Sequence, residues 1–158
     1  MQSSLTVPAT LDSLPVIANY VMTAAAVAGL DQKTTYNCRL AVDEIATNII
    51  TYGYSQASSE EKLNLQADID EQALTIAIED TGIAYNPYET HLPNQDELNR
   101  PLQERLIGGL GIYLALNSVD EFHYERVGNK NRNVFIVYRR QGEWGVGGVG
   151  GDEGETQP

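Results

Sequence analysis

Hydrophobic and polar positions at the start of the chain predict a short strand followed by a helix. Leu5 and Val7 alternate with polar neighbours, as in a half-buried strand. Residues 12–15, Asp-Ser-Leu-Pro, combine a capping side chain with a proline, which is typical of a helix start. Apolar residues then recur at helical spacing over residues 16–28, and Gly29 ends the repeat as a C-terminal glycine does.

A second and longer helical repeat follows. Asp31 is suited to cap its start, and the repeat continues to about Tyr52. This helix is therefore expected to pack on one side and to present polar side chains on the other. Its apolar face consists of Leu40, Ala41, Val42, Ile45, Ile49 and Tyr52.

The second half of the chain alternates between strand patterns and one short helix. Apolar and polar residues alternate over residues 63–69 and 74–78, and the polar residues 70–72 between them predict a hairpin. A long polar segment with three prolines follows, over residues 81–107. The elements predicted beyond it are a helix over residues 112–118 and two strands over residues 120–126 and 133–139, joined by a turn at residues 128–131.

This order of elements predicts an α+β fold. We expect a two-layer sandwich with the helices on one face of a mixed, largely antiparallel sheet. The length of 158 residues fits one domain, over residues 1–140. Residues 141–158 are rich in glycine and contain four acidic residues but no basic one, so they are predicted to form a disordered acidic tail.

Composition and charge exclude several classes of function. The net charge of −12 argues against direct binding to nucleic acid or to an anionic membrane surface. No apolar run approaches the roughly 20 residues of a membrane span, and the N-terminus lacks the features of a signal peptide. The single cysteine, Cys38, permits no internal disulfide, so we expect a cytoplasmic protein. Nucleotide binding remains compatible with an acidic chain, because Mg²⁺ and local donors can supply the site.

Residues 40–48, Leu-Ala-Val-Asp-Glu-Ile-Ala-Thr-Asn, carry the first candidate chemistry. Glu44 and Asn48 are four residues apart, so the helix places them on one face, away from its apolar side. An amide oxygen is a ligand that Mg²⁺ accepts, and a neighbouring carboxylate could orient or deprotonate a nucleophile. The alternative is a solvated polar face with an ordinary Glu–Asn contact.

Two further segments could complete a ligand site. Asp80 stands at a predicted strand end beside Gly82, so its carboxylate could accept a hydrogen bond from an exocyclic amine such as that of adenine. Residues 108–111, Gly-Gly-Leu-Gly, precede a predicted helix whose N-terminus favours a phosphate. Taken singly, the first is an ordinary turn and the second a flexible linker. The glycine segment matches neither the P-loop nor the dinucleotide fingerprint.

Together the three segments resemble the anti-sigma-factor serine/threonine kinases, a branch of the histidine-kinase-like (GHKL) ATPase superfamily. Residues 40–48 look like the N-box of that family, and residues 79–87, Glu-Asp-Thr-Gly-Ile-Ala-Tyr-Asn-Pro, look like its G1 box. Residues 108–112, followed by Asp-Glu at residues 120–121, look like its G2 box. The resemblance covers residues 5–140, and the combination of boxes is more specific than any one of them.

The resemblance implies the Bergerat fold, an α/β sandwich that binds ATP with Mg²⁺. Asn48 would bind the Mg²⁺ that bridges the phosphates, and Glu44 would be the general base for a serine or threonine hydroxyl. Asp80 would accept a hydrogen bond from the adenine amine, with Gly82 beside the ring.

The same resemblance implies a phosphate-binding loop and an ATP lid. Gly109 and Gly111 would face the phosphates together with Gly108, and Arg105 could reach them from the preceding loop. Residues 81–107 would form the lid.

This chain departs from the family pattern at three places. Ala84 stands where many members have a second glycine of the G1 box, although the anti-sigma branch often lacks it, and Asn86 stands where an aspartate is frequent. Residues 131–133, Asn-Arg-Asn, stand where many members have Gly-Thr before the last strand, and no role is assigned to them.

Three functional hypotheses fit the sequence, and the sequence favours the first. The first is a kinase that phosphorylates a small antagonist of the STAS type, with a sigma factor as a second candidate partner and a homodimer as a candidate assembly. The second is a catalytically silent nucleotide-binding adaptor that sequesters a regulatory partner. The third is the output half of a regulator whose other domain lies on another chain. A sensor histidine kinase is disfavoured, because His91 and His123 lie outside any phosphoacceptor-like helix.

Overall fold

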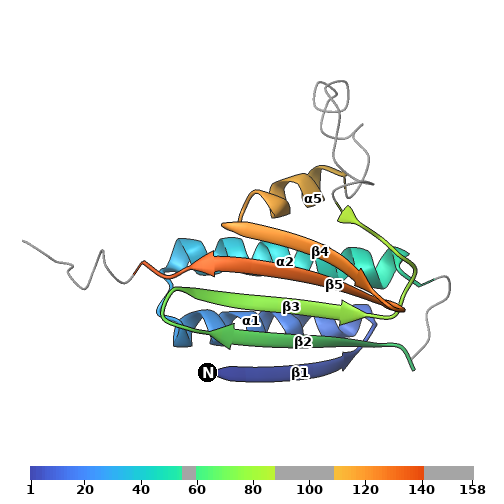
Figure 1. The fold of residues 1–158 in the computed structure, drawn as a ribbon, viewed down its shortest axis with the longest axis horizontal. Coiled ribbons are helices and arrows are strands. Elements are labelled where there is room, and N and C mark those ends of the chain that lie inside the picture. Colours follow the sequence, from blue (N-terminus) through green and yellow to red (C-terminus); the bar gives the residue numbers. More distant parts are fainter. Residues whose placement is uncertain (55–59, 88–108, 141–158) are drawn as a thin grey trace, which may run out of the picture.

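The computed structural model describes residues 1–54, 60–87 and 109–140. It contains a five-stranded sheet with the order β1-β2-β3-β5-β4 and helices on one face (Figure 1). The strands are β1 (Gln2–Pro8), β2 (Lys62–Ile69), β3 (Ala73–Asp80), β4 (Glu121–Val127) and β5 (Lys130–Tyr138). The helices are the short 3₁₀ helix η1 (Leu11–Ser13) and the α-helices α1 (Leu14–Val27), α2 (Gln32–Tyr52) and α5 (Gly109–Leu116).

All four strand pairings are antiparallel, so the expected α+β fold with helices on one side is confirmed. Alternate side chains of each strand point toward the helices, as the strand patterns predicted. Phe122 and Phe135 make an edge-to-face contact there, with ring centroids 5.1 Å apart. Burying each large side chain stabilises the fold by about 1.5–3 kcal/mol. Among the described residues, the largest apolar side chains that are fully buried are Phe135, Ile17, Ile45, Leu63, Leu65, Leu74, Ile76, Ile78 and Ile112.

The starts and ends of the first two helices follow partly from local signals. Asp31 caps α2 as predicted, because its Oδ1 atom accepts a hydrogen bond of 2.7 Å from the Thr34 amide. Gly29 adopts a φ of +77° just after α1, a conformation that glycine permits. The capping side chain expected for α1 is not found, since the Ser13 hydroxyl donates instead to the Pro8 carbonyl at 2.7 Å.

Two predicted boundaries in the C-terminal half are wrong. Helix α5 begins at Gly109, three residues before the predicted start at Ile112, so two of the glycines lie within its first turn. The last turn contains only Gly128 and Asn129, because Gly128 adopts a φ of +62° and closes a two-residue hairpin loop. As a result Asn131, expected in the turn, belongs to β5.

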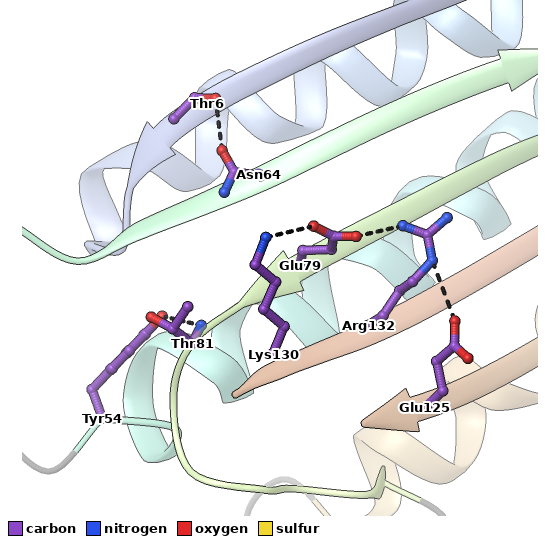
Figure 2. A network of polar contacts seen from close by, with 8 residues as sticks. All are labelled: Thr6, Tyr54, Asn64, Glu79, Thr81, Glu125, Lys130 and Arg132. Atoms are coloured by element: carbon purple, nitrogen blue, oxygen red, sulfur yellow. Dashed lines mark hydrogen bonds and ion pairs between the residues drawn. The ribbon is translucent and has the colours of Figure 1, made fainter. Parts of the chain in front are cut away.

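The sheet face opposite the helices is open and polar. The Glu79 carboxylate on β3 forms ion pairs with the Arg132 guanidinium at 2.7 Å and with the Lys130 ammonium at 4.0 Å (Figure 2). The Arg132 guanidinium also lies 3.6 Å from the Glu125 carboxylate on β4. Such partly exposed ion pairs add little stability. Within the described residues, no helix combines the length and the apolar character needed to cross a membrane.

Candidate functional site

Glu44 and Asn48 contact each other on α2, as their spacing predicted. The Asn48 amide nitrogen donates to the Glu44 Oε2 atom at 2.8 Å and to the Glu44 backbone carbonyl at 2.7 Å. Both partners are acceptors, which assigns the nitrogen of the amide to this side. Asn48 is only 3% exposed, so this is not the solvated polar face that the sequence left open.

Helix α5 lies against α2 and brings Gly111 to the Glu44 carboxylate. A Cβ atom at Gly111 would lie 2.6 Å from both the Cδ and the Oε2 atoms of Glu44. The glycine therefore permits the first turn of α5 to approach this carboxylate. Helix N-termini favour negative charge, so this turn is a suitable place for an anionic group.

Asp80 ends β3 and forms the second half of the site. Its Oδ1 atom accepts hydrogen bonds from the Gly82 amide at 2.8 Å and from the Asn131 side chain at 3.0 Å. Its Oδ2 atom is buried and has no hydrogen-bond partner within the described residues. A buried, unpartnered carboxylate oxygen is costly unless a ligand satisfies it.

Burial raises the pKa of Asp80 above its usual value. Hydrogen bonds from Asn131 and Gly82 and the positive charge of Arg126 act in the opposite direction. These donors favour the ionised acceptor form that a ligand amine requires.

The turn after β3 is fastened to the end of α2. The Ile83 amide donates to the Gly53 carbonyl at 2.9 Å, and the Thr81 amide donates to the Tyr54 hydroxyl at 3.3 Å (Figure 2). A Cβ atom at Gly82 would lie only 2.4 Å from the Gly53 carbonyl oxygen. Gly53 directly follows α2, the helix that carries Asn48. The hydrogen bond from Ile83 to Gly53 therefore ties the turn after Asp80 to the end of that helix.

The C-terminal hairpin fastens the same turn from the other side. Arg126 donates to the Gly82 carbonyl at 2.9 Å, and the Asn131 amide nitrogen donates to the Ile83 carbonyl at 2.8 Å. The Tyr124 hydroxyl donates to the Asn131 side-chain oxygen. Sequence reasoning missed Asn131, Tyr124 and Arg126, although the departure from Gly-Thr at residue 131 had marked the place.

The predicted residues fall into two groups. Glu44 and Asn48 on α2 lie together with Gly111 on α5. Asp80 and Gly82 lie together at the end of β3. Gly109 starts α5, and the positions proposed for Arg105 and Gly108 lie outside the described residues. Across the described part of the chain, no cluster of three or more acidic, histidine or cysteine side chains could hold a metal. The side-chain oxygen of Asn48 is a ligand of the kind that Mg²⁺ accepts.

The chain is similar to one family of ATPase domains. A family model described as a histidine kinase-like ATPase domain matches residues 7–137. No curated protein matches the chain significantly.

Comparison with solved structures gives matches at low sequence identity, and the first of them shares the fold. The RsbU and RsbW domains of Rv1364c from Mycobacterium tuberculosis align with 87% of this chain at a TM-score of 0.61 and 14% identity, and the chain spans 32% of that one. The histidine kinase domain of the blue-light activated kinase EL346 from Erythrobacter litoralis aligns with 85% of this chain and 62% of its own, at TM-score 0.49 and 16% identity. The Acinetobacter baumannii histidine kinase AdeS aligns with 87% of this chain and 68% of its own, at TM-score 0.45 and 15% identity.

Proposed function

Since the chain belongs to the histidine kinase-like ATPase family, we propose that it is an ATP-dependent serine/threonine protein kinase of the anti-sigma-factor type. Its substrate would be a small antagonist protein of the STAS type, and a sigma factor would be its second partner. The observation that carries the proposal is the buried Oδ2 atom of Asp80 beside the Gly82 turn, to which no described residue donates a hydrogen bond.

The Asp80 half of the site fits an adenine ring. An amino group of the ligand would supply the donor that Oδ2 lacks, while Oδ1 keeps its two protein donors. Gly82 has no side chain to obstruct a flat ring near the backbone. Arg126 and Gly53 hold the turn in place through its carbonyl and amide groups.

The Asn48 half fits the phosphates and their cation. Because the Asn48 nitrogen is committed to Glu44, its oxygen is the atom that would coordinate Mg²⁺. The first turn of α5, with Gly109 and Gly111, would donate backbone amides to the phosphates. Arg105 and Gly108 remain proposals for the same task.

Glu44 is the proposed general base. Bound ATP with Mg²⁺ supplies a phosphoryl group whose transfer requires mainly positioning and charge neutralisation. Glu44 would accept the proton of the attacking serine or threonine hydroxyl, and Asn48 orients its carboxylate through the 2.8 Å hydrogen bond. Gly111 leaves this carboxylate room beside α5.

Titration calorimetry with ATP and Mg²⁺ tests the nucleotide site. In Asp80→Asn the new amide group places a donor where Oδ2 stood, because the Gly82 and Asn131 donors hold the oxygen on the other side. We expect ATP affinity to fall about 10- to 100-fold, the value of one hydrogen bond to a charged group. Asp68→Asn is the matched control, since Asp68 is exposed on the open face of β2. Absence of saturable binding to the wild type would refute the proposal.

A transfer assay separates the kinase from the silent adaptor. With labelled ATP and candidate antagonists of the STAS type, Glu44→Gln should abolish phosphate transfer and keep ATP binding within a few-fold. Asn48→Ala should weaken binding of ATP with Mg²⁺ more than binding of ADP without the metal, while Asn64→Ala on the open face should change neither. If the wild type binds ATP but transfers no phosphate to any of the candidate antagonists, the adaptor hypothesis replaces the kinase hypothesis.

A further inference from the structure

We propose that Asn131, oriented by Tyr124, is a positioning residue that aligns Asp80 and makes the site prefer a 6-aminopurine over a 6-oxopurine. This inference rests on the proposed nucleotide site, and it concerns two residues to which the family resemblance assigned no role. Both belong to the C-terminal hairpin, Tyr124 to β4 and Asn131 to β5.

The orientation of the Asn131 amide is determined at both ends. Its oxygen accepts a hydrogen bond from the Tyr124 hydroxyl and lies 3.4 Å from the Tyr85 backbone amide, which also donates. Its nitrogen faces acceptors, the Asp80 Oδ1 atom at 3.0 Å and the Ile83 carbonyl at 2.8 Å. A flipped amide would place oxygen against oxygen, so only one orientation is stable.

This orientation determines which Asp80 oxygen is available. Asn131 and the Gly82 amide both donate to Oδ1, so the plane of the carboxylate is fixed and Oδ2 is left without a partner in the described part of the chain. The donor Asn131 and the acceptor Asp80 are each 2% exposed, so water cannot readily take the place of Asn131 in this hydrogen bond. Asp80 therefore presents one directed acceptor oxygen.

A fixed acceptor discriminates between purines. Adenine carries an amino donor at position 6, whereas guanine and hypoxanthine carry a carbonyl oxygen there. A carbonyl placed at Oδ2 would bring two acceptors together and leave the buried carboxylate unsatisfied, which strongly disfavours such ligands. If Asp80 could rotate or take up a proton, this discrimination would weaken.

Calorimetric titration of ADP and of inosine diphosphate, each with Mg²⁺, measures the discrimination. It is expressed as the dissociation constant of inosine diphosphate divided by that of ADP. We expect the wild type to bind ADP at least about tenfold more tightly than inosine diphosphate. Asn131→Ala should reduce that ratio about tenfold, chiefly by weakening ADP. Tyr124→Phe keeps the shape of the pocket and should reduce the ratio to an intermediate value.

Asn133→Ala is the matched control. Asn133 lies two residues further along β5, on the same face of the sheet and 1% exposed, and none of the described hydrogen bonds joins it to Asp80. A merely structural loss should lower the thermal midpoint of Asn133→Ala and Asn131→Ala alike, but only Asn131→Ala should change the ratio.

The outcomes separate this inference from the nucleotide proposal. If Asn131→Ala and Tyr124→Phe keep the wild-type ratio, or if Asn133→Ala changes it equally, the inference is wrong and the nucleotide site stands. If the wild type binds both nucleotides equally, the inference is also wrong. If the wild type binds neither, both proposals fall.

Discussion

Replacing Gly82 by alanine tests whether the turn after β3 is held by its close approach to α2. The added Cβ atom would lie 2.4 Å from the Gly53 carbonyl oxygen and 3.0 Å from the Asp80 Oδ1 atom. Ordinary contact begins near 3.4 Å, so the turn must retreat by about 1 Å. The obstacle is backbone, which cannot swing aside as a flexible side chain would.

The retreat has two separable costs. Overpacking of this kind lowers the free energy of unfolding by about 1–3 kcal/mol. It also lengthens the 2.9 Å hydrogen bond between Ile83 and Gly53 and moves the donors that hold Asp80. We therefore expect ATP affinity to fall about tenfold, as when one hydrogen bond to a charged group is lost.

Gly128→Ala is the matched control for this substitution. No atom of a described residue lies within 4 Å of its added Cβ, but its φ of +62° strains a residue with a side chain. It should lower the free energy of unfolding by about 1–2 kcal/mol and leave ATP affinity unchanged. Urea unfolding and titration calorimetry measure the two quantities. If Gly82→Ala binds ATP like the wild type, the close approach to Gly53 does not shape the site.

Two other substitutions separate stability from function. Gly111→Ala should reduce phosphate transfer about tenfold or more while changing the free energy of unfolding by less than about 1 kcal/mol. The reason is that the three atoms nearest to the added Cβ all belong to the end of the Glu44 side chain, which can move aside. Equal transfer by variant and wild type would contradict this. Burial raises the pKa of Asp80 in the folded protein. The contribution of Asp80 to the free energy of unfolding is therefore fully present below about pH 4, where the carboxyl is protonated in both states, and is lost as the pH rises through the raised pKa. Asp80→Asn should therefore be at least as stable as the ligand-free wild type at pH 8, with the advantage shrinking toward pH 4 in urea unfolding; a variant less stable at every pH would contradict this.

Much of the fold followed from local patterns. Strand alternation over residues 63–69 and 74–78 placed β2 and β3, because one sheet face is buried and a shift by one residue would expose it. The Asp31 cap and the long apolar repeat placed α2 to within a residue. Glu44 and Asn48 were paired correctly, since helical spacing alone brings them together.

The rest of the site depends on contacts between distant segments. Asn131 was assigned to a turn because glycine and asparagine neighbours suggested a longer loop than the two residues that Gly128 closes. The start of α5 was placed too late because glycines read as a linker, whereas Gly111 packs on Glu44 from another helix. The hydrogen bond from Asn131 to Asp80 Oδ1 joins residues that lie fifty-one positions apart, so it follows only from the pairing of β5 with β3.

That strand order has a consequence for biosynthesis. Strand β5 follows the other described strands along the chain, yet it pairs with the central strand β3 on one side and with β4 on the other. Until the ribosome has released it, β3 is an open edge next to the apolar core, and such edges invite pairing with other chains. Nascent or truncated chains that end before β5 should therefore aggregate and bind no nucleotide, so the chain becomes able to bind its ligand only after β5 has been made.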